Sequence, residues 1–518
     1  MSQTAIPSLW GQLYPFETRV LGALMRHLEH LAASRGEGKA KKFATTGLVY
    51  CVYPDAFGDL DGLGGQLPRL QGLGVSVLWL LPLLSSPGRD QGFDISDYTQ
   101  VDARHGGNAA LSRLLQAAEP LGIHVIFDIA VNHTSDLHPW FVAARDPGSP
   151  FRDYYLWSET GREFSSAPLV FPGLVDSNWT WRPEASAWNF HRFYPFQPDL
   201  NYRNPQVAFE MVRILTNWKV FGVNGFRMDA AALLWKEEGT DCDSRPQVHL
   251  LLRLFQACLD ALGPGSLLLA EANVAPEPLL AYFGDGDECK AAYHFDLMPR
   301  FYQTLLDGNP QRLAEARFPD LPADCAWLTF LRLHDEVTLE LVPIGERAAL
   351  AASYTKLPEA AFRNGQAFSG RLFDLFDRNP AKTLLAWSLL FSLPGTPILY
   401  YGDEIGMENN GEFYRAEAAR TGFADSRFLH RGPWDAGRER QTRDEPESPA
   451  GRVHAGLLAM LQIRKAHPEL VAARPEVTVQ GQRLTSVRSW NGSSLTIVND
   501  LSAGTYSWSV TPEEPGAR

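Results

Sequence analysis

The chain has 518 residues, of which 45% are hydrophobic and 21% charged, as in a globular protein with a large core and unlike a disordered chain. Its 60 acidic residues outnumber its 47 lysines and arginines, which gives a formal charge of −13. Such a surface repels the phosphate backbone of nucleic acids, so no nucleic acid partner is expected. A neutral ligand suits the composition better. The 14 Trp and 16 Tyr side chains offer faces that stack on apolar ring faces and tips that form hydrogen bonds.

The five cysteines are odd in number and scattered, with no CxxC pair, which argues against a disulfide framework and a zinc ribbon. The first residues, MSQTAIPSLWGQLYPFE, lack a basic stretch followed by an apolar one, so no secretion signal is predicted. The most apolar run, 384–393, is too short to cross a bilayer. We therefore predict a soluble cytoplasmic protein with no membrane partner, of unknown oligomeric state.

Residues 15–34 carry apolar positions at helical spacing, and we assign residues 1–45 to an N-terminal helical segment. From Thr46 the pattern changes to short β-type runs that alternate with longer amphipathic stretches. Buried parallel strands read as nearly continuous apolar runs, so helices between such runs indicate βα units. The clearest runs are 47–53, 75–82, 124–132, 223–230, 266–273, 327–335 and 396–404.

These units predict an α/β fold, a (β/α)8 TIM barrel over 46–133 and 205–465, with a weakly marked strand near 291–295. The interval 134–204 is rich in aromatic residues and proline and lacks a long helix pattern. We interpret it as an insertion after the third strand, since loops of that length are usually functional. Three further β-type runs predict a small C-terminal antiparallel β domain over 466–518.

Several predicted strands end in a charged residue immediately after the apolar run. In a βα barrel these ends converge on one mouth, where barrel enzymes keep their sites. Any one of these residues alone is better explained as a helix cap or a barrel salt bridge, but the set favours a site. The residues are Asp128, Arg227, Asp229, Glu271, His334 and Asp335.

Clustered carboxylates without metal-ligand spacing indicate acid/base and nucleophilic chemistry on a neutral substrate. Glycoside cleavage needs such a pair, because one carboxylate attacks the anomeric carbon while a carboxylic acid protonates the leaving oxygen. A nearby like charge raises the pKa of the acid and keeps it protonated near neutrality. The residues alone do not say which carboxylate takes which role.

Four short blocks resemble, in order and context, the regions shared by the α-amylase superfamily, glycoside hydrolase family 13: DIAVNH (128–133), GFRMDAAAL (225–233), AEAN (270–273) and LHD (333–335). The resemblance implies a retaining mechanism on an α-glucoside, through a covalent β-glucosyl-Asp intermediate. It implies that Asp229 is the nucleophile and Glu271 the general acid/base. Asp335 would be the third carboxylate, which binds sugar hydroxyls and stabilises the transition state.

The same resemblance implies further binding residues around these acids. Arg227 would hold the nucleophile ionised, while His133 and His334 would bind hydroxyls of the sugar being cleaved. Asp128 would support the floor of the site. The insertion 134–204 corresponds to the domain B of the family, which roofs the substrate cleft.

The segment GRDQGFDISDY (88–98) resembles a motif of family members that bind a terminal glucose. The match implies that Asp90 binds the distal hydroxyls of that glucose and that Phe93 keeps a stacking face. A plain turn before an Asp-capped helix is the alternative explanation. Arg427 would pair with Asp90, with Arg431 as a substitute.

Two groups within the family resemble parts of this sequence, and they imply different activities. FLRLHDEVTLELV and LYYGDEIGM resemble the trehalose synthases, which favours a maltose/trehalose α-glucosyltransferase (isomerase). VYCVYPDAFGDLDGL (49–63) and DSRFLHRGPWD (425–435) resemble amylosucrases and sucrose hydrolases, so a sucrose-acting enzyme is the alternative, with a plain exo-acting α-glucosidase as the third. The leaving group, acceptor and linkage depend on the second sugar site, for which the candidates are Phe196, Gln197, Trp235 and Lys236.

No cofactor is expected to be required. The chain lacks a dinucleotide fingerprint, a P-loop and a GxSxG elbow. Relatives carry a calcium loop that is shortened here to PDAFGDLDG (54–62), which argues against calcium at that place. Asp59 and Asp61 are the remaining candidate ligands, and Asp61 is better explained as a turn residue. A catalytically dead binding module is disfavoured, because all three acids are present.

Overall fold

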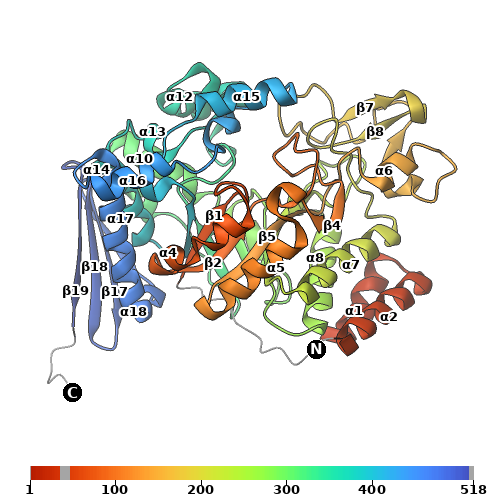
Figure 1. Ribbon diagram of the computed structural model, residues 1–518, viewed down its shortest axis with the longest axis horizontal. Helices are drawn as coiled ribbons and strands as arrows, with labels where there is room; N and C mark the ends of the chain where they lie inside the picture. The colour runs from red at the N-terminus through yellow and green to blue at the C-terminus, as the bar shows by residue number, and fades with distance from the viewer. Residues whose placement is uncertain (1, 35–46, 513–518) are drawn as a thin grey trace.

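The computed structural model describes residues 2–34 and 47–512, and a closed barrel of eight parallel strands forms its core (Figure 1). Each strand pairs with the next one along the chain, and the last closes on the first through Val49 and Ile398. The predicted barrel is confirmed, including its weakly marked strand. The strands are β1 (Leu48–Val52), β2 (Val75–Leu80), β5 (His124–Ala130), β9 (Gly225–Asp229), β10 (Leu267–Ala270), β11 (Ala291–Tyr293), β12 (Ala326–Thr329) and β15 (Thr396–Tyr400).

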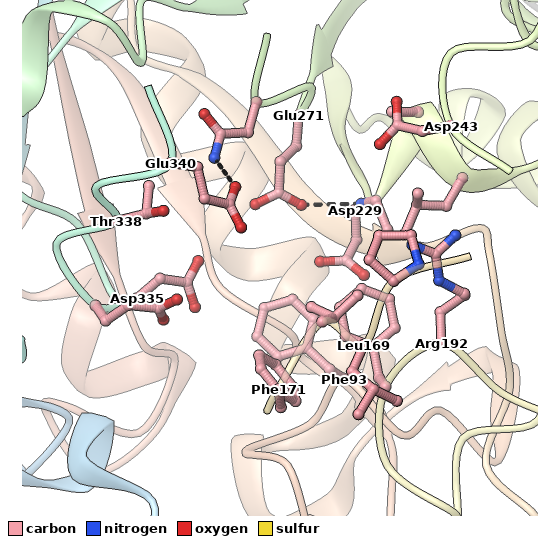
Figure 2. Close-up of a pocket in the computed structure, with 18 of the residues that line it drawn as sticks. Phe93, Leu169, Phe171, Arg192, Asp229, Asp243, Glu271, Asp335, Thr338 and Glu340 are labelled. Carbon is pink, nitrogen blue, oxygen red and sulfur yellow. Dashed lines mark hydrogen bonds between the residues drawn. The ribbon is translucent and has the colours of Figure 1, made fainter. Parts of the chain in front are cut away.

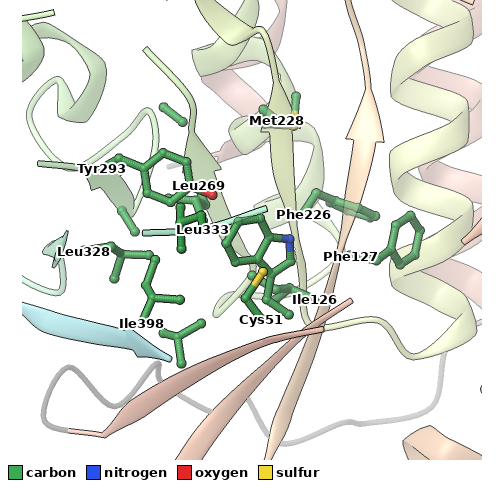
Figure 3. Close-up of a cluster of buried hydrophobic side chains, with 14 of the residues drawn as sticks. Cys51, Ile126, Phe127, Phe226, Met228, Leu269, Tyr293, Leu328, Leu333 and Ile398 are labelled. Atoms are coloured by element: carbon green, nitrogen blue, oxygen red, sulfur yellow. The ribbon is translucent and has the colours of Figure 1, made fainter. Parts of the chain in front are cut away.

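Large side chains fill the barrel interior (Figure 3). Cys51, Ile126, Leu328 and Ile398 are all fully buried there, and Trp79 contributes its indole ring. The barrel is therefore a packed core and not a pore, which leaves its mouth as the place for a ligand.

Helices surround the barrel. The helix that follows the insertion, α7 (Pro205–Phe221), begins at the cap Asn204 with a proline in its first turn and ends at Gly222 in the left-handed region. The others are α3 (Leu60–Gly64), α4 (Leu67–Gly72), α5 (Gly107–Ala118), α8 (Pro246–Ala261), α9 (Pro276–Leu279), α10 (Leu297–Asp307), α11 (Gln311–Ala314), α12 (Ile344–Tyr354), α13 (Leu372–Leu375), α14 (Pro380–Ser392), α15 (Gly411–Thr421), α16 (Ala436–Asp444), α17 (Pro449–Ala466) and α18 (Pro468–Ala472).

The N-terminal segment forms two helices, α1 (Ser2–Leu13) and α2 (Thr18–Ser34), which lie against α8 and α7 (Figure 1). Both lie within the segment predicted to be helical, and the second matches the run of helical spacing at 15–34. Ile6 and Trp10 of α1 are buried, and Tyr14 Oη donates a hydrogen bond to Tyr202 O at 2.8 Å. The predicted domain boundary at residue 45 lies outside the described residues.

The insertion folds into α6 (Pro139–Ala144) and a small sheet of β6 (Trp157–Ser158), β8 (Ala187–Phe190) and β7 (Trp179–Arg182). Bridges between His133 and Asp199 and between Tyr155 and Leu200 join its two ends beside the barrel mouth. Two short hairpins border the same mouth, β3 (Leu84–Ser85) with β4 (Asp97–Val101) and β13 (Ala361–Phe362) with β14 (Ala367–Phe368).

A four-stranded antiparallel sheet lies at the end of the molecule opposite this insertion (Figure 1). Its strands are β16 (Glu476–Gln480), β17 (Arg483–Trp490), β18 (Ser493–Asp500) and β19 (Thr505–Thr511). Three of them match the predicted runs, and the edge strand β16 was missed. Among the described residues, no helix combines the length and the apolarity needed to cross a membrane.

Candidate active site

The carboxyl ends of the barrel strands open into a cavity of about 400 Å³, within the range of small-molecule sites (Figure 2). Asp229 ends β9, Glu271 follows β10, and Asp335 comes from the loop after β12. All three line the cavity, together with Asp90 and Phe93 from the loop after β2. The structure thus brings together carboxylates that are far apart in the sequence, as the strand-end pattern predicts.

Arg227 lies beneath the cavity and links its carboxylates. Its buried guanidinium places Nη1 2.7 Å from Asp128 Oδ1 and 2.5 Å from Asp229 Oδ1, while Nη2 contacts the Glu271 carboxylate. Trp79 Nε1 donates to the other Asp128 oxygen at 2.9 Å. Asp128 is therefore fully engaged in holding Arg227, which leaves Asp229 and Glu271 on the cavity side.

Asp229 and Glu271 titrate near neutrality. Burial raises the pKa of each to about 7, and Arg227 opposes this rise by favouring the ionised forms. Glu271 also accepts a hydrogen bond from the Ala230 amide at 2.9 Å. A carboxyl pair with such values can hold one proton at neutral pH, so one member can act as a base or nucleophile and the other as an acid.

Asp335 stays ionised. Burial alone would raise the pKa of this carboxyl, but the guanidiniums of Arg427 and Arg431 hold it below its usual range. The distances from Asp335 Oδ1 are 3.2 Å to Arg427 Nη1 and 3.1 Å to Arg431 Nη2. Because burial lowers the pKa of His334 well below its ordinary value, that ring is neutral at pH 7 and the arginines supply the charge.

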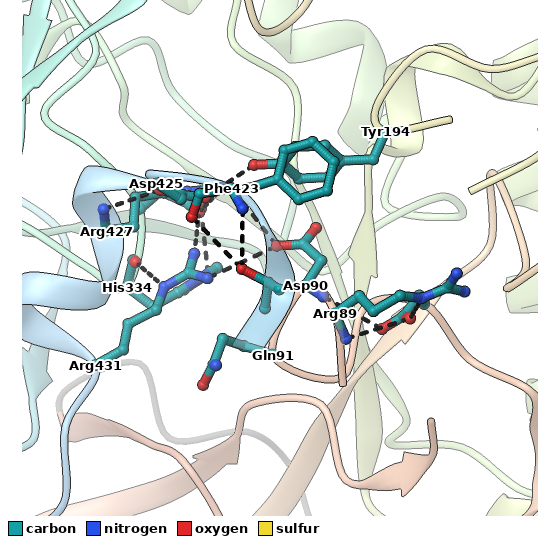
Figure 4. Close-up of polar contacts among 12 residues, drawn as sticks. Arg89, Asp90, Gln91, Tyr194, His334, Phe423, Asp425, Arg427 and Arg431 are labelled. Atoms are coloured by element: carbon teal, nitrogen blue, oxygen red, sulfur yellow. Dashed lines mark hydrogen bonds and ion pairs between the residues drawn. The ribbon is translucent and has the colours of Figure 1, made fainter. Parts of the chain in front are cut away.

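Asp90 lines the cavity and lies within a network of polar contacts (Figure 4). Asp90 is 5% exposed, and Gln197 Nε2 donates to its Oδ2 at 3.1 Å. Its Oδ1 is 3.4 Å from Arg427 Nη2 and 3.8 Å from Arg431 Nη1, so both arginines named from the sequence contact it. Asp425 fixes Arg427 from behind at 2.6 Å. Asp90 thus has a rigid position at the bottom of a pocket.

Phe93 and His133 complete this end of the cavity. The Phe93 ring stacks on His334 with centroids 5.5 Å apart and presents an apolar face beside the carboxylates. Burial lowers the pKa of His133 to about 4, so its ring is neutral at pH 7. A neutral imidazole beside carboxylates suits hydrogen bonding to hydroxyl groups.

Three of the predicted binding residues lie behind the cavity wall. Gln197, Arg227 and His334 are buried and contact residues that line the cavity, but they do not line it themselves. Gln197 Nε2 also lies 3.3 Å from His133 Nε2 and so joins Asp90 to His133. We interpret these side chains as positioning residues in the free protein.

The remaining candidates for the second sugar site are not at the cavity. Phe196 stacks on Tyr194 with centroids 5.1 Å apart, and Trp235 packs in the core below Arg203. Lys236 Nζ pairs with Asp199 Oδ2 at 2.7 Å. None of these three side chains lines the cavity, because each packs against the insertion or the core instead.

Sequence reasoning did not single out eight further residues that line the cavity. Four of them, Asn273, Glu336, Thr338 and Glu340, stand in the blocks AEAN and FLRLHDEVTLELV, so their places beside Glu271 and Asp335 could have signalled them. The other four lie in loops without a recognisable motif. The residues are Leu169, Phe171, Arg192, Asn273, Glu336, Thr338, Glu340 and Arg363.

The candidate calcium ligands are engaged elsewhere. Asp59 caps α3 and accepts from the Gly62 amide at 2.8 Å. Asp61 lies inside α3 and pairs with Arg113 at 2.6 Å, so its interpretation as a turn residue is wrong. Within residues 2–34 and 47–512, no three His, Cys, Asp or Glu side chains gather as metal ligands would. All five cysteines are free.

Residues 34–328 match the family description "Alpha amylase, catalytic domain". The trehalose synthase of Thermus thermophilus is 42% identical over 359 residues, which are 69% of this chain and 37% of that protein. The trehalose synthase of Pimelobacter sp. is 38% identical over 400 residues, 73% of this chain and 70% of that protein. The chain spans less than two thirds of the Thermus relative, and it covers 60% of the trehalose synthase/amylase of Mycobacterium tuberculosis.

Solved structures share the fold at lower identity. A sucrose 6F-phosphate phosphorylase from Thermoanaerobacter thermosaccharolyticum has a TM-score of 0.75 at 16% identity, covering 92% of this chain and 97% of that one. An α-amylase from H. orenii has a TM-score of 0.66 at 22% identity, covering 88% and 89%. These likenesses concern the fold alone.

Proposed function

Because the chain belongs to the α-amylase family, we propose that it transfers an α-glucosyl group of a small saccharide with retention of configuration. The observation that carries this proposal is the contact of one buried arginine, Arg227, with both Asp229 and Glu271. That contact places two carboxyls with pKa values of about 7 next to each other at a cavity. Retaining glycosidases need such an adjacent pair.

In the first step an Asp229 oxygen attacks the anomeric carbon, and the glycosidic C–O bond breaks. Glu271 gives its proton to the leaving oxygen, so the products are a β-glucosyl ester on Asp229 and a free sugar. In the second step an acceptor hydroxyl attacks the same carbon and returns its proton to Glu271, while the ester bond breaks. Arg227 supports the first step because it favours the ionised form of Asp229.

Asp335 and Asp90 suit the binding of a terminal glucose. Both are carboxylates held by Arg427 and Arg431, so they can accept hydrogen bonds from sugar hydroxyls without moving. Phe93 adds a ring for the apolar face of the sugar. The burial of Asp90 leaves no path for a longer chain beyond it, which favours exo-action on small substrates.

We propose that the enzyme interconverts maltose and trehalose. The support is the identity of 42% and 38% to trehalose synthases over more than two thirds of this chain. In this reaction the glucose released in the first step stays in the cavity, turns, and attacks the ester with a different hydroxyl. Such retention requires that water be kept out, which a cavity roofed by Leu169 and Phe171 of the insertion favours.

A sucrose-acting enzyme is the second candidate. It is favoured by the segment DSRFLHRGPWD, whose Arg427 stands between Asp90 and Asp425 as the resemblance to amylosucrases and sucrose hydrolases implies. The chemistry on Asp229 and Glu271 would be the same, with fructose as the leaving group. A cytoplasmic location and independence from cofactors also stay predictions.

The test is product analysis after incubation with maltose, trehalose and sucrose in separate reactions, with Asp229→Asn as the blank. We expect maltose and trehalose to be interconverted with little free glucose. Fructose release from sucrose, with the other two sugars untouched, would replace the first candidate by the second. Free glucose as the main product from maltose would indicate a plain α-glucosidase.

A further inference from the structure

A second, smaller cavity of about 200 Å³ lies beside the active-site cavity. The two cavities share Leu169, Glu340 and Arg363 among their lining residues, so these side chains form the wall between them. Beyond the wall the small cavity is lined by Arg347, Asn364 and Gln366 as well as Pro172 and Leu339. Amide and guanidinium donors beside apolar surface are the groups that bind sugar hydroxyls and ring faces.

An ion-pair network closes the wall. Arg363 Nε lies 3.0 Å from Glu336 Oε1, and Arg363 Nη1 contacts the Glu340 carboxylate. The same Glu340 carboxylate accepts a hydrogen bond from Asn273 Nδ2. Because Asn273 follows Glu271 by two residues, the wall lies close to the residue that we propose as the donor to the leaving oxygen.

The backbone fixes Arg363 in place. Arg363 and Asn364 both have left-handed φ angles, 48° and 54°, which non-glycine residues adopt only when their surroundings impose them. Gly173 of the insertion packs so closely on this turn that a Cβ there would lie 2.4 Å from Asn364 Oδ1. The wall is therefore clamped between the β13–β14 hairpin and the insertion.

The network differs from an ordinary surface ion pair in its burial. The Glu336 side chain is 4% exposed and Arg363 17%, while Glu340 is 44% exposed. Removing one partner of the buried Arg363–Glu336 pair would leave a buried charge unpaired, whereas the Arg363–Glu340 pair is partly exposed and easier to break. Glu340 is the member that can leave the wall at the lowest cost, because water already reaches it.

We propose that the Arg363–Glu340 pair sets the length of the substrate by separating a site for two sugar units from a cavity that would accept a third. This inference rests on the proposed function, and it names Arg363 as a specificity-determining residue. With the pair closed, the second glucose unit of maltose ends at the wall. With the pair removed, the third unit of maltotriose enters the small cavity and contacts Arg347 and Gln366.

The test compares kcat/KM for maltose and maltotriose in the full chain and in two variants that open the wall from opposite sides, Arg363→Ala and Glu340→Ala. We expect the wild-type protein to prefer maltose by at least tenfold and each variant to lose at least tenfold of that preference, mainly through a lower KM for maltotriose. General damage to the fold would lower both values and leave their ratio unchanged. If Arg363→Ala does not fold, Glu340→Ala is the remaining test. This variant leaves Arg363 paired with the buried Glu336, so no buried charge loses its partner.

Two controls accompany the variants. Arg363→Lys keeps a cation beside Glu336 and Glu340 and should keep the preference for maltose. Arg474→Ala removes another paired arginine, which contacts Asp320 at 2.6 Å and lines neither cavity, and should change nothing. The proposal is overturned if the wild-type protein uses maltotriose as well as maltose, or if both opening variants keep the wild-type ratio. A wild-type protein inactive on maltose and trehalose would instead refute the proposed function, and this inference with it.

Discussion

Asp335 and Arg427 meet at 3.2 Å, although 92 positions separate them in the sequence. Arg427 comes from the segment after α15 and also contacts Asp90 at 3.4 Å, so one guanidinium joins the two carboxylates that we assign to the terminal glucose. Because Asp425 also holds this guanidinium at 2.6 Å, Arg427 cannot move toward Asp90 or Asp335 without losing its contact with the other of these two carboxylates. Arg431 contacts the same two carboxylates at 3.1 and 3.8 Å, so this end of the pocket depends on two guanidiniums, of which Arg427 is also paired with Asp425.

The first prediction concerns the side chain of Arg427. Arg427→Gln should lower kcat/KM for maltose by about 100-fold, the usual cost of removing one group that supports transition-state charge. It should also raise the pKa of Asp335 toward its ordinary value, but this pKa starts well below those of Asp229 and Glu271. The acid limb of the pH profile should therefore stay where the Asp229–Glu271 pair sets it. Steady-state kinetics between pH 4 and 9 would check both expectations, and an acid limb that moves to higher pH would show that Asp335 limits the rate in this variant.

The second prediction is a narrow, bell-shaped pH dependence of kcat/KM centred near pH 7. The active form carries one proton on the pair Asp229 and Glu271, whose pKa values burial raises to about 7. Below the optimum both carboxyls are protonated and the nucleophile is lost; above it both are ionised and the acid is lost. The two measured values belong to the pair, since the groups interact.

The variant Glu271→Gln should separate the acid limb of this pH profile from the alkaline limb. An aryl α-glucoside with a good leaving group does not need a proton from the acid, so this variant should still form the glucosyl ester from it. Its rate should then show only the acid limb, which belongs to Asp229. A variant that keeps both limbs would mean that Glu271 is not the acid.

Much of the site could be predicted from the sequence, because its acids stand at strand ends. The order of strands and helices fixes the direction of each βα unit. Asp229 and Glu271, at the ends of β9 and β10, must therefore lie at the same mouth of the barrel, whatever the conformation of the loops. The positions of Asp90 and Arg427 required the resemblance to a family. Glu340 stands in the quoted block FLRLHDEVTLELV, but its contact with Arg363 could not be found, since loop residues meet only through tertiary packing that carries no local pattern.

The same reasoning explains the elements that were weakly marked or missed. β11 is three residues long and contains two alanines, so its β signal is weak, and its neighbours in the barrel fix it. β16 lies at the sheet edge, and its exposed polar positions resemble a loop. The helix α1 contains Pro7 and has little amphipathic pattern, so packing against α8 stabilises it more than its own propensity does.

The third prediction tests this interpretation of α1. Trp10 is 1% exposed, and Trp10→Ala should lower the free energy of unfolding by about 3–5 kcal/mol, the range for large aromatic residues in cores. Gln12→Ala on the exposed side of the same helix is the matched control and should have little effect. Urea unfolding followed by tryptophan fluorescence would measure both. Equal midpoints for the two variants would mean that α1 does not contribute to the stability of the barrel.

The fourth prediction concerns metal removal. Asp59 caps a helix and Asp61 pairs with Arg113, so neither carboxylate is free to bind calcium without breaking a contact that the fold uses. Dialysis against EDTA should therefore leave both the melting temperature and the activity on maltose unchanged, and added calcium should not raise them. Asp61→Asn offers an independent check: it removes an exposed ion pair, which contributes little to stability. A melting temperature that falls in EDTA and recovers with calcium would place a structural ion in this protein, and retention of that response in Asp61→Asn would locate it away from the shortened loop.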